Sequence, residues 1–252
     1  MQKKWYFCGE KMKKVAAARC GAWALVVFSG LLIVSVGLWR LLRPHTPHVE
    51  VDRAVFPIVG VDISAHNGAP DFDSVAGAGV DFVYLKASEG SSFRDAAFIR
   101  NYAAARRTDL AVGAYHFFRF DSDGVSQAEN LLGALRGLRM DLPVAIDVEE
   151  WQNAATVPTS LVIERLETML SLLRDAGHRV IVYTNKSGHS RFLRDVDAEL
   201  WICSFTTPPI GRTDWRLWQH SHLGRLPGVA GVVDMDTFNG TRQEWEAWLA
   251  GE

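Results

Sequence analysis

VAIDVEEW, residues 144–151, carries an apolar run directly into three acidic residues, Asp147, Glu149 and Glu150. Side chains alternate between the two faces of a β-strand, so Asp147 and Glu149 share one face and Glu150 lies on the other. The stretch fits two structures: a strand that leaves the core for solvent, or a strand that delivers a pair of carboxylates to a site. The rest of the chain distinguishes them.

Apolar, β-rich runs recur along the chain, and helix-like segments follow the first five of them. The runs cover residues 58–64, 81–88, 110–118, 142–149, 178–184, 198–205, 214–220 and 232–238. The clearest helical segments are 93–108, 124–138, 158–177 and 242–250. Strands that alternate with helices and are apolar throughout indicate a parallel sheet. We expect an α/β fold, an irregular TIM-like barrel of eight parallel-type strands, with five β/α units and then three strands.

An open, doubly wound sheet is the alternative architecture. Such a sheet is expected to carry a glycine-rich phosphate loop after its first strand, but residues 62–71, DISAHNGAPD, contain no G-x-G-x-x-G. A nucleotide site is therefore not expected. The formal net charge of -2 gives no reason to expect a nucleic-acid partner.

The N-terminal segment differs from the rest. No residue from Cys20 to Trp39 is charged, and the length suffices to span a bilayer. Lysines and arginines are more numerous before this run than after it, which orients the N-terminus to the cytoplasm. We expect a basic cytoplasmic segment (1–20), a transmembrane anchor (21–42), a linker (43–57) and an extracytoplasmic barrel domain (58–252). A cleaved signal peptide is the alternative, although no small-x-small cleavage site follows the run.

Polar side chains stand at the carboxyl ends of most predicted strands, where barrel enzymes place their sites. Any one of them fits an ordinary solvated strand end; the whole set is harder to explain that way. The set comprises Asp62, Ser64, Lys86, Glu89, Tyr115, His116, Asp147, Glu149, Tyr183, Asn185, Asp234 and Asp236.

Three kinds of chemistry could use these residues. His66 and His116 are isolated and no H-x-x-H or H-E-x-x-H spacing occurs, so neither a metal nor another cofactor is expected. No G-x-S-x-G is present, which disfavours a serine nucleophile. Carboxylate chemistry remains. Two acids on one face raise the pKa of one of them, which provides a proton donor beside a charged neighbour, as glycoside cleavage requires.

Six short motifs, in this order, resemble the glycoside hydrolase family 25 lysozymes. They are GVDISAHNG, FVYLKASEG, GAYHFF, AIDVEE, WQHS and VDMDTFNG, and they lie between residues 58 and 240. Each motif alone is weak, whereas six in sequence are specific. The resemblance implies a membrane-anchored muramidase. Its substrate would be the peptidoglycan glycan strand, cut between N-acetylmuramic acid and N-acetylglucosamine.

The resemblance also assigns residues. Glu149 matches the general acid, Asp147 the acid beside it, and Asp62 and Asp234 the other two cleft acids. Further cleft or cleft-wall positions correspond to Lys86, Glu89, Tyr115, His116, Tyr183, Trp201, Trp218 and Asp236. Asn67, Phe72 and Asp236 depart from the residues usual in the family, but no acid is lost. The resemblance leads us to expect net retention of anomeric configuration.

Other functions stay open at this stage. A chitinase-like hydrolase would need the pattern D-x-x-D-x-D-x-E, whose first two acids are replaced here by Leu142 and Ala145. A metal-dependent phosphoesterase barrel lacks evident ligands. A non-catalytic wall-binding module of the same fold would not need to keep all four acids.

Overall fold

The computed structural model describes Ser35, Val49, residues 51–209 and residues 215–252. All of these except Ser35 belong to a compact unit that runs from Pro47 to Glu252. The predicted anchor, 21–42, lies outside the described residues apart from Ser35. Among the helices of the described part, none is long and apolar enough to cross a bilayer.

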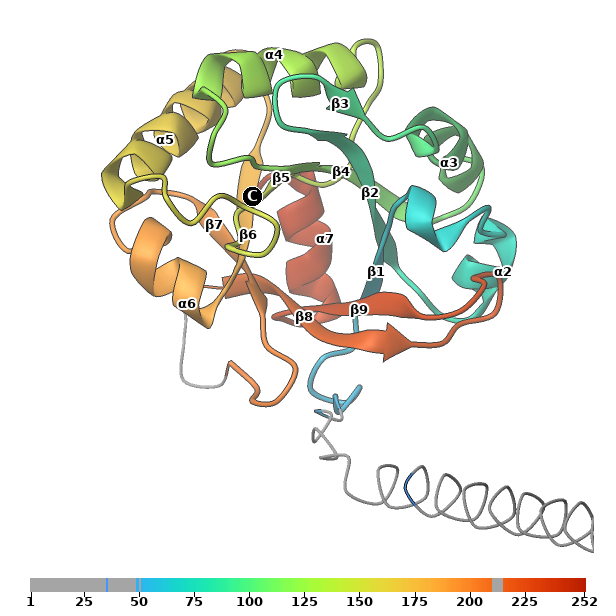
Figure 1. The fold of residues 1–252 in the computed structure, drawn as a ribbon. Helices are drawn as coiled ribbons and strands as arrows, with labels where there is room; N and C mark the ends of the chain where they lie inside the picture. The colour runs from blue at the N-terminus through green and yellow to red at the C-terminus, as the bar shows by residue number, and fades with distance from the viewer. Residues whose placement is uncertain (1–34, 36–48, 50, 210–214) are drawn as a thin grey trace, which may run out of the picture. The chain divides into compact units, whose positions relative to one another are not determined.

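Eight strands close into a barrel (Figure 1), which confirms the predicted architecture. Closure follows from β1, which pairs with β2 on one side and with β9 on the other. A ninth strand, β3, is a two-residue hairpin partner of β2. The strands are β1 (Val59–Ile63), β2 (Phe82–Glu89), β3 (Phe93–Arg94), β4 (Ala111–Phe117), β5 (Val144–Asp147), β6 (Val180–Asn185), β7 (Glu199–Cys203), β8 (Trp215–Gly224) and β9 (Val233–Phe238).

The last strand runs against the others. Seven strands of the barrel run parallel to one another, and β9 is antiparallel to both β8 and β1. The parallel strands are β1, β2, β4, β5, β6, β7 and β8. The expectation of eight parallel-type strands was wrong for this strand. The segment 225–232 between β8 and β9 is short enough for the chain to turn back directly, which places β9 antiparallel to β8.

The helices cover the outside of the barrel, except for the last one, α7, which covers one of its ends. They are α2 (Phe72–Gly77), α3 (Phe98–Ala105), α4 (Gly124–Leu135), α5 (Thr159–Asp175), α6 (Lys186–Gly188) and α7 (Arg242–Ala250). The helix predicted at 93–108 begins five residues later than expected. Asp95 explains the delay, because its carboxylate accepts hydrogen bonds from the backbone N–H of Ala97 and Ala65 and holds the chain in a turn before Phe98.

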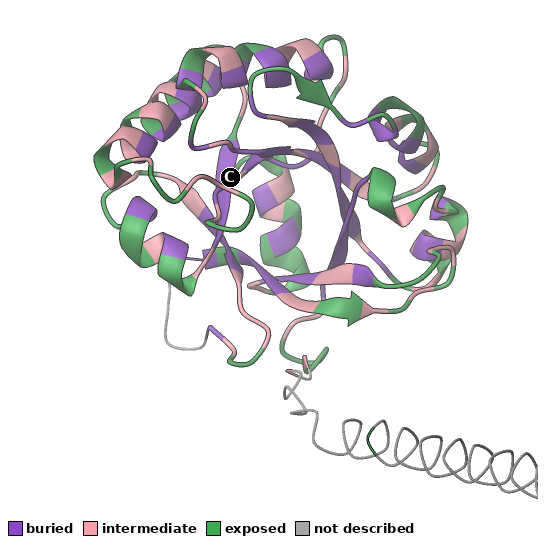
Figure 2. Ribbon diagram, in the orientation of Figure 1, coloured by how far each residue is buried: buried purple, intermediate pink, exposed green. Residues whose placement is uncertain are grey.

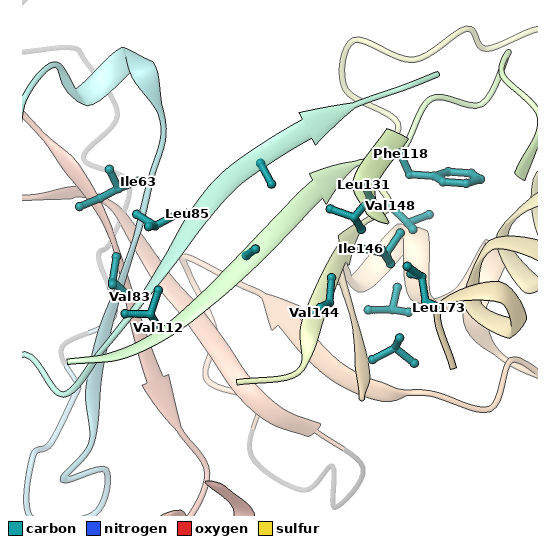
Figure 3. Close-up of a cluster of buried hydrophobic side chains, with 14 of the residues drawn as sticks. Ile63, Val83, Leu85, Val112, Phe118, Leu131, Val144, Ile146, Val148 and Leu173 are labelled. Carbon is teal, nitrogen blue, oxygen red and sulfur yellow. The ribbon is translucent and has the colours of Figure 1, made fainter. Parts of the chain in front are cut away.

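One apolar layer lies between the strands and the outer helices (Figure 3). Val144, Ile146 and Val148, alternate residues of the opening stretch, point into it together with Leu131 of α4 and Leu173 of α5. The strands are mostly buried while the helices keep exposed outer sides (Figure 2). Since one face of β5 is buried against helices, its other face, with Ala145 and Asp147, is turned into the barrel.

A second apolar layer fills the lower barrel. Phe82 and Phe238 lie at the end of the barrel where the parallel strands begin, and α7 covers this end with two tryptophans. The ring of Trp245 lies 5.1 Å from that of Phe82 and 5.2 Å from that of Phe238, and Trp248 lies 5.4 Å from Phe238. With that end plugged by aromatic rings, only the carboxyl ends of the parallel strands are left to form a site.

Val51 and Phe56, within the predicted linker, pack on the outside of the barrel. Phe56 contacts Trp215 and Trp218 of β8, with ring centroids 6.0 and 5.8 Å apart. Trp218 is 1% exposed and its indole N–H donates to the Ser204 carbonyl. This tryptophan therefore belongs to the outer apolar layer.

Candidate active site

Four carboxylates gather at the carboxyl end of the parallel strands. Asp62 lies on β1, Asp147 ends β5, and Glu149 follows two residues later. Asp234 lies near the start of β9, and because β9 is antiparallel, its start meets the other strands' ends. Asp62 and Asp234 are direct partners in the β1–β9 register. Antiparallel pairing thus brings the fourth acid to the site.

Glu149 is half-buried, and its pKa is raised to about 7 by burial and then by the negative charge of Asp234. Lys86 acts in the opposite direction and lowers the pKa of this carboxyl. A carboxylic acid with a pKa near 7 is protonated in a large fraction of molecules at neutral pH. Glu149 can therefore donate a proton, the property a general acid requires.

Asp147 lies beside Glu149, and burial followed by the charges of Glu149 and Asp62 holds its pKa well above the ordinary value. Its Oδ1 atom is buried and has no hydrogen-bond partner among the described residues. Tyr115, on the neighbouring strand β4, has a raised pKa caused by burial and then by Asp62 and Asp147. These residues form one polar cluster, in which Asp147 Oδ1 can still accept a hydrogen bond from a ligand.

Asp62 is tied to the barrel interior through Gln219, a residue that sequence reasoning missed. The Gln219 amide Nε2 donates to Asp62 Oδ2 over 2.7 Å, and its Oε1 accepts from the Tyr183 hydroxyl over 2.8 Å. The signal was present in WQHS at 218–221. Since Leu217 is an interior residue, alternation sends Gln219 inward and Trp218 outward.

A cation stands beside the acids. Lys86 Nζ lies 2.8 Å from Glu89 Oε2, and Arg119 Nη1 lies 3.6 Å from Glu89 Oε1. Lys86 Nζ also lies 5.2 Å from the centre of the Phe117 ring, within cation–π range. Glu89 thus joins two cations at the ends of β2 and β4, and the Lys86 charge favours ionised carboxylates nearby.

Two predicted cleft residues form a layer below the acids instead. Trp201 is 2% exposed, and its ring lies 4.7 Å from Tyr84 and 5.1 Å from Tyr183. Its indole N–H donates to Asp236 Oδ1 over 3.0 Å. Asp236 is fully buried, and burial followed by the charge of Asp62 raises its pKa well above the usual range. These side chains support the site and are sealed from a ligand above it.

His116 and Trp218 were predicted to line the cleft, but both lie outside the barrel interior, which corrects the sequence interpretation. His116 is fully buried, with Nδ1 2.8 Å from Ser88 Oγ and Nε2 3.2 Å from Gln127 Oε1 of α4. Burial lowers the pKa of His116 to about 4. His116 follows the inward residue Tyr115, so alternation turns it outward, as it turns Trp218 into the outer layer.

Glu150 is exposed and faces away from the cluster. Its carboxylate forms an ion pair with Arg191 and accepts a hydrogen bond from Ser187 over 3.2 Å. Within the residues that the structure describes, no group of three or more His, Cys, Asp or Glu side chains is arranged to hold a metal ion. The site offers proton transfer and negative charge.

Comparison with known proteins agrees with this arrangement. The family model described as "Glycosyl hydrolases family 25" matches residues 61–229. "Lysozyme M1" of Streptomyces globisporus is 31% identical over 206 residues, which cover 73% of this chain and 68% of that protein.

Two solved structures are also similar. A family 25 glycosyl hydrolase from Bacillus anthracis superposes with a TM-score of 0.73 at 31% identity, covering 81% of this chain and 97% of that one. The bacterial lysozyme from Streptomyces coelicolor gives a TM-score of 0.69 at 28% identity, covering 77% and 97%.

Proposed function

The chain belongs to the glycosyl hydrolases of family 25, and from this premise we propose that it cleaves the glycan strands of peptidoglycan. The bond cut is the β-1,4 linkage from N-acetylmuramic acid to N-acetylglucosamine. The names of similar proteins support this substrate, since Lysozyme M1 is one of them. The observation that carries the proposal is the meeting of Asp62, Asp147, Glu149 and Asp234 at one barrel end, with the pKa of Glu149 raised to about 7.

Glu149 is the general acid in this proposal. Its proton passes to the glycosidic oxygen as the bond from that oxygen to the anomeric carbon breaks, and the N-acetylglucosamine hydroxyl leaves. Positive charge then develops on the ring of N-acetylmuramic acid. The neighbouring acids Asp147, Asp62 and Asp234 supply the negative charge that stabilises such an oxocarbenium-like state. Lys86, Glu89, Tyr115 and Tyr183 line the same end and are the proposed substrate contacts.

We propose net retention of configuration by two displacements. The acetamido oxygen of the substrate first attacks the anomeric carbon as the glycosidic bond breaks; water, giving its proton to Glu149, then attacks the same carbon and breaks the bond to the acetamido oxygen. Asp147, next to the acid, is suited to orient that acetamido group. NMR analysis of the first product anomer tests this step. Early appearance of the inverted anomer would rule it out.

The proposed setting is the extracytoplasmic side of a membrane. Residues 21–42 anchor the chain, and the basic residues of 1–20 keep the N-terminus in the cytoplasm. A reporter fused after Glu252 is expected to be active only outside the cytoplasm. Cytoplasmic reporter activity would overturn the orientation.

Product analysis tests the activity. The purified chain is incubated with isolated peptidoglycan, and the new reducing ends are identified by borohydride reduction. Reduced N-acetylmuramic acid is expected; reduced N-acetylglucosamine would indicate another specificity, and no product would favour a wall-binding module.

Two variants complete the test. Glu149→Gln removes the proton and is expected to lower kcat by about 10²–10⁴-fold. Glu167→Gln is the matched control, because Glu167 is exposed on α5, on the outside of the barrel. Its activity is expected to remain within about twofold of wild type.

A further inference from the structure

Trp151 is a large aromatic side chain left in solvent, two residues after the proposed acid Glu149. It is 66% exposed, more than any other large apolar side chain in the part of the chain that the structure describes. It lies on the loop that leaves the carboxyl end of β5 and leads to α5. Ligand-binding residues lie disproportionately on loops that a rigid scaffold holds in place.

The loop is fixed on one side by Asn153. Its Nδ2 donates to the carbonyl of Glu149 over 2.8 Å and to that of Phe118 over 2.9 Å. Its Oδ1 accepts from the backbone N–H of Phe120 over 2.8 Å. One side chain therefore joins the backbone of the proposed acid to the segment after β4.

The loop is fixed on its other side by Glu150. This carboxylate pairs with Arg191 and accepts from Ser187, both of which lie on the segment after β6. Trp151 thus sits between two anchored neighbours, Glu150 and Asn153, while its own ring stays exposed. The exposed ring of Trp151 gains no stability from burial. Because its loop is already fixed, a ligand that covers the ring does not have to order the loop.

The backbone next to the tryptophan is strained. Gln152 has a φ of +58°, and it is the one non-glycine residue with positive φ in the described ranges 51–209 and 215–252. Long side chains avoid this left-handed region unless the surroundings enforce it. Strained conformations of this kind concentrate at ligand-binding positions.

We propose that Trp151 is a stacking surface for a sugar ring of the bound glycan strand, close to Glu149. One face of a β-1,4-linked pyranose consists largely of C–H groups, and the flat face of an indole matches it in size and polarity. Because the loop is already ordered, the sugar binds without ordering the protein. The inference rests on the proposed glycan-cleaving function and adds a binding contact to it.

Steady-state kinetics of the full-length chain in detergent, on isolated peptidoglycan, test the inference. Trp151→Ala is expected to lower kcat/KM about fivefold to tenfold, mainly through KM, because stacking holds the substrate and does not take part in bond cleavage. Trp151→Phe keeps a flat ring and is expected to recover most of the loss. Ile99→Ala is the matched control, since Ile99 is 59% exposed on α3.

A binding measurement complements the kinetics. Co-sedimentation with peptidoglycan is compared for Glu149→Gln and for the double variant Glu149→Gln/Trp151→Ala, and the double variant is expected to bind less. Wild-type kinetics in Trp151→Ala would refute the stacking surface while leaving the proposed function intact. An equal loss in Trp151→Ala and Trp151→Phe, with a lowered melting temperature in both, would show a structural role instead. Absence of cleavage by the wild type would refute the proposed function itself.

Discussion

Asp62 and Asp234 face each other directly across the antiparallel pair β1–β9. Like charges opposite each other in a sheet are unfavourable, and both residues lie in a partly dry barrel mouth. Gln219 offsets part of the repulsion by donating a hydrogen bond to Asp62. The remainder acts on Asp62, whose pKa is held well above its ordinary value by burial and then by the charge of Asp234. Burial also raises the pKa of Asp234 to about 6. The barrel thus maintains an electrostatically unfavourable cluster that a folded domain would otherwise avoid.

Removing one charge should stabilise the protein at alkaline pH. The pKa of Glu149 rises from 4.5 to about 7 on folding, so between those pH values the folded state binds more protons than the unfolded state. Stability therefore falls as pH rises through this window. Glu149→Gln has no such titration, and we expect it to be about 1–2 kcal/mol more stable than wild type at pH 8.

Urea unfolding at pH 8 and pH 4 measures this effect. The gain from Glu149→Gln should disappear at pH 4, where Glu149 is protonated in both states. Glu150→Gln, at the exposed neighbour, should show no gain at pH 8. A gain of equal size at both pH values would mean that charge is not its cause.

The pKa of Glu149 should depend on Asp234. The negative charge of Asp234 raises the pKa of Glu149, so Asp234→Asn should lower that pKa by roughly half a unit to one unit. NMR titration of ¹³C-labelled glutamate carboxyls follows Glu149 directly, whatever the variant's activity. Asp73→Asn is the control, because Asp73 is an exposed acid on α2, and it should leave the pKa of Glu149 unchanged. An unchanged titration in Asp234→Asn would show that burial alone sets the pKa.

Gln219→Ala should impair the reaction without a change of fold. The variant loses the hydrogen bond that lowers the pKa of Asp62. It also loses the acceptor of the Tyr183 hydroxyl. A hydrogen bond to a charged group is worth enough for a loss of about 10–100-fold in kcat/KM. The acid limb of the pH–rate profile should also move to higher pH, because Asp62 then ionises less readily. Gln243→Ala, exposed on α7, is the control; matching profiles for the two variants would contradict the role.

Gly60→Ala should destabilise the barrel. A Cβ atom at Gly60 would lie 2.1 Å from the Phe82 ring, which fills the closed end of the barrel. We expect a loss of about 1–3 kcal/mol from overpacking. Gly77→Ala is the control, because a Cβ atom there meets nothing within 4 Å. Thermal unfolding compares them, and equal melting temperatures would mean that Phe82 moves aside freely.

Much of the fold could be predicted because the strands alternate with helices in clear apolar runs. The final helix was placed at 242–250, where α7 lies. The direction of β9 was missed because periodicity contains no information on strand direction. The length of the connection is a partial guide: segment 225–232 is short enough for the chain to turn back directly, although β7 and β8 are parallel with only residues 204–214 between them. Connection lengths should be read together with the strand pattern.

Side-chain placement was harder to predict than strand position. Acids at strand ends were found because an acid after an apolar run is conspicuous in a sequence. His116 was placed in the cleft by its position at a strand end and Trp218 by resemblance, although strand alternation sends both outward. Gln219 was overlooked beside a more conspicuous tryptophan. Trp151 gave no signal, because exposure depends on how neighbouring residues hold the loop.

Barrel closure joins the first strand of the domain to the last one, with Val59 paired to Thr237. A growing chain therefore cannot seal its sheet until nearly the whole domain has been synthesised, and such distant pairing folds slowly. Asp234 arrives on the same closing strand. A partly made chain has neither a complete barrel nor a complete set of acids, so fold and chemistry begin together.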